Sequence, residues 1–377
     1  MSVIIFLIVL AVLIITHEFG HFIVAKKSGI RVDEFGLGFP PKLFGWKKGE
    51  TVYSLNALPF GGFVKIHGEN PDEESIAGSD SDRSMANKPR LVQAAVLAAG
   101  VTFNILLAWL LISVGFMYGL PTSAGQAPAG TALENVRLMI TSVAPESPAE
   151  TAGIKAGDIV VAYGEKKGAE TVYAESVDIP SIQEYLAAKE GKQVVIKYLR
   201  GQENPRAPAS NIHETTVVPA PGIVEGRPAV GISMDMVGTL RLPWWKALVS
   251  GAEFTAQLII ATVVGLKDFF MSLFTDGKEA LSSVTGPIGL VGLVGDASEL
   301  GLAYLLSFTA FISINLAVLN MVPFPALDGG RLLFLAIEGI KGSRLNPKIA
   351  NAFNLVGFAL LILLMITITI SDIGRLF

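Results

Sequence analysis

Long stretches without charged residues constrain this chain more than any other feature of its sequence. The hydrocarbon core of a bilayer is about 30 Å thick, and a helix needs about 20 apolar residues to cross it. Three windows of that length contain no Asp, Glu, Lys, Arg or His: residues 91–118, 300–327 and 349–371. A fourth apolar run begins at Ser2 and leads into His17-Glu18-Phe19-Gly20-His21. We therefore predict an α-helical polytopic membrane protein with four transmembrane helices.

Composition limits the chemistry that the chain can carry. Only 16% of the 377 residues are charged, against about 25% in soluble proteins, and the formal net charge is -4. This charge provides no basic field for a nucleic acid, so we expect no such partner. The chain has no cysteine, which excludes disulfides, thiolate zinc ligands and a cysteine nucleophile. A metal ion would need carboxylates and some of the four histidines, His17, His21, His67 and His213.

The N-terminal apolar run could be a cleaved signal peptide or a retained helix. A signal peptide has a basic segment before the apolar run and small residues at a cleavage site after it, and neither is present here. A retained helix of about 25 residues, from Ser2 to Lys26, fits the sequence better.

The rest of the chain divides by composition. Residues 135–235 alternate short β-branched runs with Gly, Pro and charged turns, which predicts an inserted β-rich soluble domain after a linker at 121–130. Residues 247–275 are apolar but contain Glu253 and Gln257, and we predict an amphipathic helix at the membrane interface. The remaining parts are residues 1–118, with the first two transmembrane helices, and residues 300–377, with the last two.

The segment between the first two helices has two parts. Thr51 to Ile66 is predicted to form a membrane-associated β-hairpin on the cytoplasmic side, and Glu69 to Asp82 is an acidic run expected to be a solvated loop. Basic residues cluster near one end of each predicted span: Lys26, Lys27, Arg31, Lys88, Arg90, Arg331, Lys341, Arg344 and Lys348. By the positive-inside rule these ends are cytoplasmic, which places both termini and the inserted domain on the opposite side.

The first predicted helix carries a candidate metal site. His17 and His21 are four residues apart, so one helix face presents both imidazoles, and Glu18 lies beside them to polarise a metal-bound water. Ionisable groups at membrane depth are costly, which favours a functional role. The alternative is that these residues lie past the membrane in the head-group layer.

A catalytic zinc site takes three protein ligands, and Asp328 is the best third candidate. It is the first charge after the uncharged window 300–327 and follows Pro323 and Pro325, which prevent a regular helix. A helix N-cap is the alternative role. His67 and His213 are expected to be ordinary surface residues. Asp328 meets the His pair only if the chain crosses the membrane an even number of times between residues 119 and 299, which favours the interfacial helix.

Several motifs in the same order resemble a known family. They are HEFGH at 17–21, Gly36-Leu-Gly38 with Pro40, Pro59-Phe-Gly61-Gly62-Phe-Val-Lys65, Gly100-x-x-x-Asn104, Thr285-Gly286-Pro287-Ile288, and NMVPFPALDGG at 320–330. Together they resemble the site-2 proteases, which are intramembrane zinc metalloproteases, and most closely the bacterial RseP type.

The resemblance implies a role for each matching residue. His17, His21 and Asp328 would bind Zn²⁺, and Glu18 would act as general base and acid. The substrate-binding residues would be Asn315, Asn320, Pro323, Pro325, Gly36, Gly38, Gly61, Gly62 and Asn104. The segments 36–38 and 51–66 match a membrane-re-entrant β element that would pair with an unwound substrate.

The insert resembles a PDZ domain, most clearly over residues 147–158. Val230, Gly231 and Ile232 would lie near its peptide groove. The chain has room for one such domain, whereas the best-known members carry two in tandem. A folded spacer without a ligand is the alternative.

The implied function is regulated intramembrane proteolysis in the bacterial inner membrane, cutting near its cytoplasmic side. Substrates would be single-pass membrane proteins, such as anti-sigma factors trimmed by an upstream site-1 protease or remnant signal peptides. A polytopic metal transporter is one alternative, but it has no need of Glu18 beside a ligand. A PDZ-bearing membrane scaffold is the other, and the complete set of expected ligands argues against it.

Overall fold

The computed structural model describes residues 1–70, 72–125, 127, 131–167, 170–174, 176–200, 212–224, 227–275 and 284–374. These residues form two compact units. The helical unit comprises residues 1–114, 248–298 and 306–377, and the β unit comprises residues 115–247 and 299–305.

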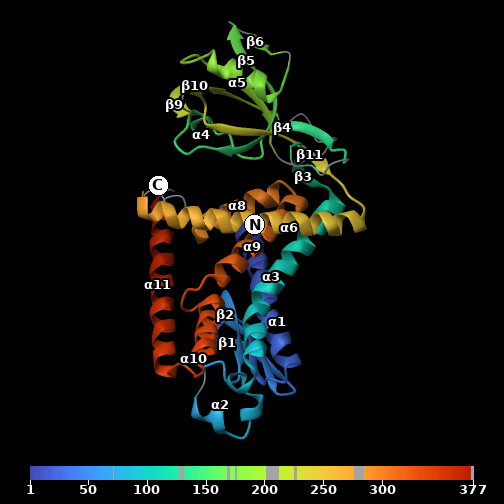
Figure 1. Ribbon diagram of the computed structural model, residues 1–377. Helices are drawn as coiled ribbons and strands as arrows, with labels where there is room; N and C mark the ends of the chain where they lie inside the picture. Colours follow the sequence, from blue (N-terminus) through green and yellow to red (C-terminus); the bar gives the residue numbers. More distant parts are fainter. Residues whose placement is uncertain are drawn as a thin grey trace. The chain divides into compact units, whose positions relative to one another are not determined.

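Long helices are present at all four predicted spans. They are α1 (Ser2–Lys27), α3 (Arg90–Tyr118), α9 (Leu302–Met321) and α11 (Pro347–Gly374). Within the described residues five helices are long and apolar enough to cross a membrane, and the fifth is α6 (Trp244–Thr275). In the helical unit α6 runs across the other long helices and not alongside them (Figure 1). The indole N–H of Trp109 on α3 donates a hydrogen bond to the carbonyl of Leu248 on α6, at 2.9 Å.

The predicted window 300–327 is a helix followed by a loop. α9 ends at Met321 because Pro323 and Pro325 cannot continue a regular helix. The helix α10 (Asp328–Lys341) then begins after six non-helical residues, and it is followed by Gly342, whose φ of 77° suits glycine. The helix α8 (Pro287–Glu299) precedes α9 in the chain. Its N-terminus is tied to α11, because the backbone N–H groups of Gly286 and Gly289 donate hydrogen bonds to the carboxylate of Asp372.

The predicted hairpin at 51–66 is wrong in its extent. Residues 51–66 form a single strand, β2 (Thr51–Ile66), which pairs with β1 (Val32–Lys48) around a turn at Gly49. Gly49 has a φ of 65°, which allows the turn there, whereas Gly61 and Gly62 lie within the strand. Residues 34–37 have partners on both sides, in 52–55 and in 62–65, so the two long strands fold into a four-segment sheet.

This sheet packs on α1, α3 and α10 through one apolar cluster. Its buried members are Ala25, Ile30, Val32, Val64, Ile66, Met85, Val96 and Leu97. The acidic run that follows is more ordered than predicted, since it contains the short helix α2 (Glu73–Ala77), capped by Asp72 and Ser75, and the start of the 3₁₀ turn η1 (Ser81–Arg83). A second 3₁₀ turn, η2 (Met85–Asn87), follows the run. Charge repulsion within the run is offset by basic partners, because Arg31 forms an ion pair with Asp80 at 2.6 Å.

The β unit contains the predicted β-rich domain. Its strands are β3 (Leu120–Ser123), β4 (Glu134–Val143), β5 (Ile159–Lys167), β6 (Glu170–Tyr173), β7 (Val194–Leu199), β8 (Ile212–Val217), β9 (Ala220–Val224), β10 (Arg227–Ala229) and β11 (Ile232–Leu240). The main sheet has the order β3-β11-β4-β5-β7-β8, with β6 beside β5, and β9 pairs with β10. Two short helices, α4 (Pro148–Thr151) and α5 (Ile179–Ala187), complete the unit. The predicted linker at 121–130 is partly wrong, because residues 121–123 belong to β3, and Gln126 and residues 128–130 lie outside the described residues.

A buried ion pair stabilises the loop between α4 and β5. Asp158 is 1% exposed and accepts hydrogen bonds from Nε and Nη2 of Arg200, at 2.8 and 2.6 Å. Its second oxygen also accepts from the backbone N–H of Lys155 at 2.8 Å. Every oxygen of this carboxylate therefore has a donor.

Candidate metal centre

Two imidazoles and one carboxylate meet where α1 approaches the start of α10. The Nε2 atoms of His17 and His21 lie 3.2 and 3.3 Å from Oδ2 of Asp328, and 3.2 Å from each other. In a tetrahedral zinc site with ligand distances of about 2.0–2.1 Å, neighbouring donor atoms lie about 3.3–3.4 Å apart. The three atoms therefore already have the spacing of one face of a zinc tetrahedron.

The hydrogen bonding around the triangle also fits a cation. Nδ1 of His21 donates to the carbonyl of Val96 at 2.8 Å, which leaves a lone pair on Nε2. Oδ2 of Asp328 is buried and has no hydrogen-bond donor among the described residues. Lone pairs thus face one another at a buried point, and a positive ion at that point would satisfy them.

Asn104 lies behind His17. It is fully buried on α3, and its amide lies 3.4 Å from Nδ1 of His17, whereas its Oδ1 has no partner among the described residues. If Nε2 of His17 offers a lone pair to a metal, its Nδ1 carries a hydrogen and needs an acceptor. The two ends of an amide have nearly the same shape, so a half-turn of the side chain gives Oδ1 that hydrogen bond and removes both mismatches.

Glycines allow α1 and α3 to approach at this point. A Cβ on Gly100 would lie 2.3 Å from Nε2 of His21, and a Cβ on Gly20 would lie 2.5 Å from the carbonyl oxygen of Ala99. The close contact explains why HEFGH and the Gly100 motif need glycine. It also brings Asn104, one helical turn beyond Gly100, to His17.

Asp328 is positioned by the loop that precedes it. Gly329 and Gly330 pack on backbone carbonyls of that loop, where a Cβ would lie 2.3 and 2.2 Å from an oxygen atom. Ala326 has a positive φ of 74°, and its N–H donates to Oδ1 of Asn354 on α11 at 3.3 Å. The two prolines therefore end α9, and the two glycines let α10 start close enough to bring Asp328 to the histidines.

Glu18 lies at the margin of the β1–β2 sheet. Its carboxylate lies near the backbone N–H of Val64 on β2. A Cβ on Gly62 would lie 3.4 Å from Cγ of Glu18 and 2.6 Å from Cγ2 of Ile14. Of the glycines predicted to bind substrate, Gly62 therefore lies beside Glu18 at the metal centre.

The other predicted site residues lie in several settings. Gly36, Gly38 and Gly61 make close contacts within the sheet, against Phe63, the Leu58 carbonyl and Phe39. Asn315 donates to the carbonyl of Phe311 on its own helix at 2.8 Å, Pro323 is exposed, and Asn320 and Pro325 are partly buried.

In the β unit, the predicted groove residue Val230 is 1% exposed and belongs to the apolar core, so its side chain is not presented to a peptide. Gly231 accepts a backbone hydrogen bond from Ala144, and Ile232 pairs with Val143. Neither His67 nor His213 joins a group of three metal-binding side chains in the described part of the chain.

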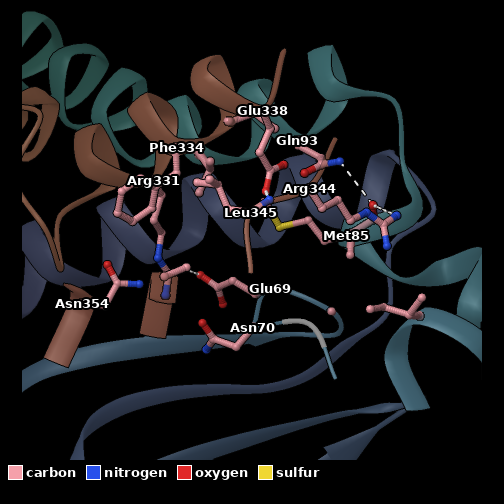
Figure 2. Close-up of a pocket in the computed structure, with 16 residues that line it drawn as sticks. Glu69, Asn70, Met85, Gln93, Arg331, Phe334, Glu338, Arg344, Leu345 and Asn354 are labelled. Carbon is pink, nitrogen blue, oxygen red and sulfur yellow. Dashed lines mark hydrogen bonds and ion pairs between the residues drawn. The ribbon is translucent and has the colours of Figure 1, made fainter. Parts of the chain in front are cut away.

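Sequence reasoning used Arg331 only as a positive charge at the cytoplasmic end of a span and gave it no role at the site. It lies one turn beyond Asp328 on α10 and forms an ion pair with Glu69, which follows β2. Figure 2 shows the two side chains facing each other at a cavity of about 270 Å³ between α3, α10 and the start of α11. Its position in the sequence, three residues after a ligand on a helix, was the signal that could have identified it.

Comparison with known proteins agrees with this geometry. The sequence model of peptidase family M50 matches residues 5–364. A putative zinc metalloprotease of Clostridium perfringens is 36% identical over 376 residues, covering 99% of this chain and 98% of the relative. A putative zinc metalloprotease of a Nostoc species is 33% identical over 385 residues, covering 100% and 97%. The regulator of sigma-W protease RasP of Bacillus subtilis is 28% identical over 453 residues, covering 100% and 99%.

The chain therefore belongs to peptidase family M50, the site-2 proteases, which confirms the resemblance found from its motifs. Its long apolar helices and its β unit make it a multi-pass membrane member of that family.

Proposed function

We propose that this protein is an intramembrane zinc endopeptidase that cleaves single-pass membrane proteins. The observation that carries the proposal is the triangle of donor atoms, with sides of 3.2, 3.2 and 3.3 Å, beside the carboxylate of Glu18. Zn²⁺ is the cofactor, bound by His17, His21 and Asp328. When bound, it lowers the pKa of a water molecule and polarises the carbonyl of a peptide bond.

The remaining chemistry belongs to the side chains of this chain. Glu18 accepts the proton of the attacking water and returns it to the leaving amine, acting as general base and then as general acid. Val96 and Asn104 orient the two imidazoles so that both Nε2 atoms face the metal. This positioning role is the one we assign to Asn104, in place of direct substrate contact.

The depth of the site supports cleavage inside the membrane. His17 lies 15 residues after Ser2 in α1, which is about 22 Å along the helix, against a hydrocarbon thickness of about 30 Å. We assign α1, α3, α9 and α11 as the four spans, and α6, which crosses them, as the interfacial helix (Figure 1). The cluster of basic residues near one end of the spans supports a metal centre toward the cytoplasm and a PDZ-like β unit on the opposite side of the membrane.

Substrate capture would use the edge of the β1–β2 sheet. Residues 62–66 pair only with β1 among the described residues, and Gly62 and Val64 of this segment lie beside Glu18. An extended substrate exposes its peptide bonds and can pair with such an edge, whereas a helix hides them. One relative is named a regulator of sigma-W, which fits an anti-sigma factor already trimmed by a site-1 protease as one substrate.

The decisive experiment is the Glu18→Gln substitution in purified, zinc-loaded protein. Because the three ligands remain, zinc content should be unchanged, while cleavage of a single-pass substrate should fall by about 10²–10⁴-fold. Glu253→Gln on α6 is the control, since it removes the charge of an exposed carboxylate on another membrane-associated helix, away from the metal centre, and this variant should cleave normally. Retention of more than about a tenth of the activity by Glu18→Gln would contradict the proposal and favour a metal transporter.

A further inference from the structure

Two arginines line a cavity of the β unit that contains no acidic side chain. Arg137 lies on β4, Arg241 follows β11, and the cavity measures about 320 Å³. The described residues around it include no aspartate or glutamate. Within the described part of the chain, neither arginine forms an ion pair, so the cavity carries two uncompensated positive charges.

The ends of two long helices contribute to the lining of the cavity. Tyr118 is the last residue of α3, Leu302 is the first residue of α9, and both line the cavity. A spanning helix leaves the hydrocarbon near its end, so these residues lie at the level of the lipid head groups. Trp244 and Trp245, which follow Arg241, are 63% and 55% exposed, as expected for tryptophans at a membrane surface.

Arg241 is held in place before any ligand binds. Its Nη2 donates to the carbonyl of Tyr118, at the C-terminus of α3, over 3.2 Å. Gly119 has a φ of 110°, and a Cβ there would lie 3.7 Å from Nε and Nη2 of Arg241. This hydrogen bond orients the exposed guanidinium at the cavity and leaves most of its five N–H donors for an anion.

We propose that this cavity binds the phosphate of an anionic phospholipid head group. Guanidinium groups match phosphate oxygens in pairs of hydrogen bonds, and head-group phosphates are the most abundant anions at this level of the membrane. The proposal requires α3 and α9 to cross the membrane, but it is independent of the protease activity. The bound lipid would connect the β unit to the surface where the two helices emerge.

The test is lipid binding by the full-length protein in detergent, measured by native mass spectrometry. Wild type should bind phosphatidylglycerol in preference to phosphatidylcholine. Arg137→Gln and Arg241→Gln should each weaken phosphatidylglycerol binding about fivefold, and together about thirtyfold. The control, Arg227→Gln, removes a charge from β10 outside the cavity and should bind normally.

A double Arg→Lys variant separates charge from folding, since it should retain part of the binding that the double Gln variant loses. The proposal is overturned if wild type binds both lipids equally, or if the double Gln variant binds phosphatidylglycerol normally. It is also overturned if inorganic phosphate, or a peptide with a free C-terminal carboxylate, displaces the lipid at equal concentration. Those outcomes would assign the cavity to a free anion or to a peptide.

Discussion

The two units each bury an aspartate, and the two aspartates have opposite surroundings. Asp158 in the β unit receives two hydrogen bonds from Arg200 and one from a backbone N–H. Asp328 in the helical unit faces two imidazole nitrogens, and its Oδ2 has no donor among the described residues. A buried charge is tolerated when it is paired within the protein or when it awaits an ion. The first carboxylate therefore stabilises the fold, and the second is arranged for chemistry.

The largest expected effect is at Asp328. Asp328→Asn keeps the shape but removes the anionic ligand, so zinc affinity and cleavage should each fall by more than about 100-fold. The thermal stability of the metal-free protein should not fall, because an unsatisfied buried charge is removed. Zinc titration and melting curves with and without a chelator measure both effects. Normal zinc content would refute Asp328 as the third ligand.

The same substitution at Asp158 should act in the opposite way. Asp158→Asn removes the counter-charge of Arg200, and because Arg200 is 34% exposed and can be solvated, the loss should be about 1–3 kcal/mol of stability in the β unit. Hydrogen exchange at the N–H of Lys155 should accelerate accordingly, while zinc content stays normal. If zinc binding fell together with the hydrogen-exchange protection of the Lys155 N–H, the division of roles between the two aspartates would be wrong.

Asn104 tests whether the metal centre depends on its supporting contacts. Asn104→Leu retains much of the side-chain volume but removes the partner of His17 Nδ1, so zinc affinity should fall about 10–100-fold. Ser313→Ala is the control, because the Ser313 hydroxyl donates to the backbone carbonyl of Asn104 at 2.8 Å and does not contact His17. Equal zinc affinity in the Asn104 variant and wild type would mean that His17 needs no such support.

A third carboxylate, Glu50 at the hairpin turn, gives the smallest effect. Hydrogen bonds from Lys26 and Arg83 lower the pKa of Glu50 below its usual value. A lowered pKa contributes stability above the unfolded value near 4.5, and this contribution is lost as pH falls through the folded value. Because Glu50 is 32% exposed, the contribution should not exceed about 1 kcal/mol. Melting temperatures of wild type and Glu50→Gln should therefore differ slightly at pH 7 and converge near pH 3.

The long helices and the metal triad could be predicted from the sequence, because each depends on local information. Absence of charge over 20 residues, the i, i+4 spacing of two histidines and two prolines before Asp328 are all visible in one stretch of chain. The resemblance added the family, which the comparisons confirm.

The supporting contacts could not be predicted, because they join residues that are distant in the sequence. Val96 is 75 residues from His21, and Asn104 is 87 residues from His17. Only residues 36–38 of β1 were assigned to a β element, for a related reason: the pairing of β1 with two parts of β2 depends on the fold of the whole sheet. Both arms of the hairpin were placed within residues 51–66, whereas these residues form the single strand β2, and its partner strand precedes it.

The open edge of the sheet has a consequence for substrate length. Five residues occupy about 7.5 Å as a helix and about 17 Å as a strand, so pairing along 62–66 lengthens a substrate segment by about 9 Å. That extra length has to be accommodated by moving one flank of the substrate along the membrane normal. A flank held by a bulky folded domain cannot move freely, whereas a short tail can be displaced by this distance. Prior shortening of a substrate would then act mechanically, because a short flank can move along the membrane normal by the distance that the extended conformation requires.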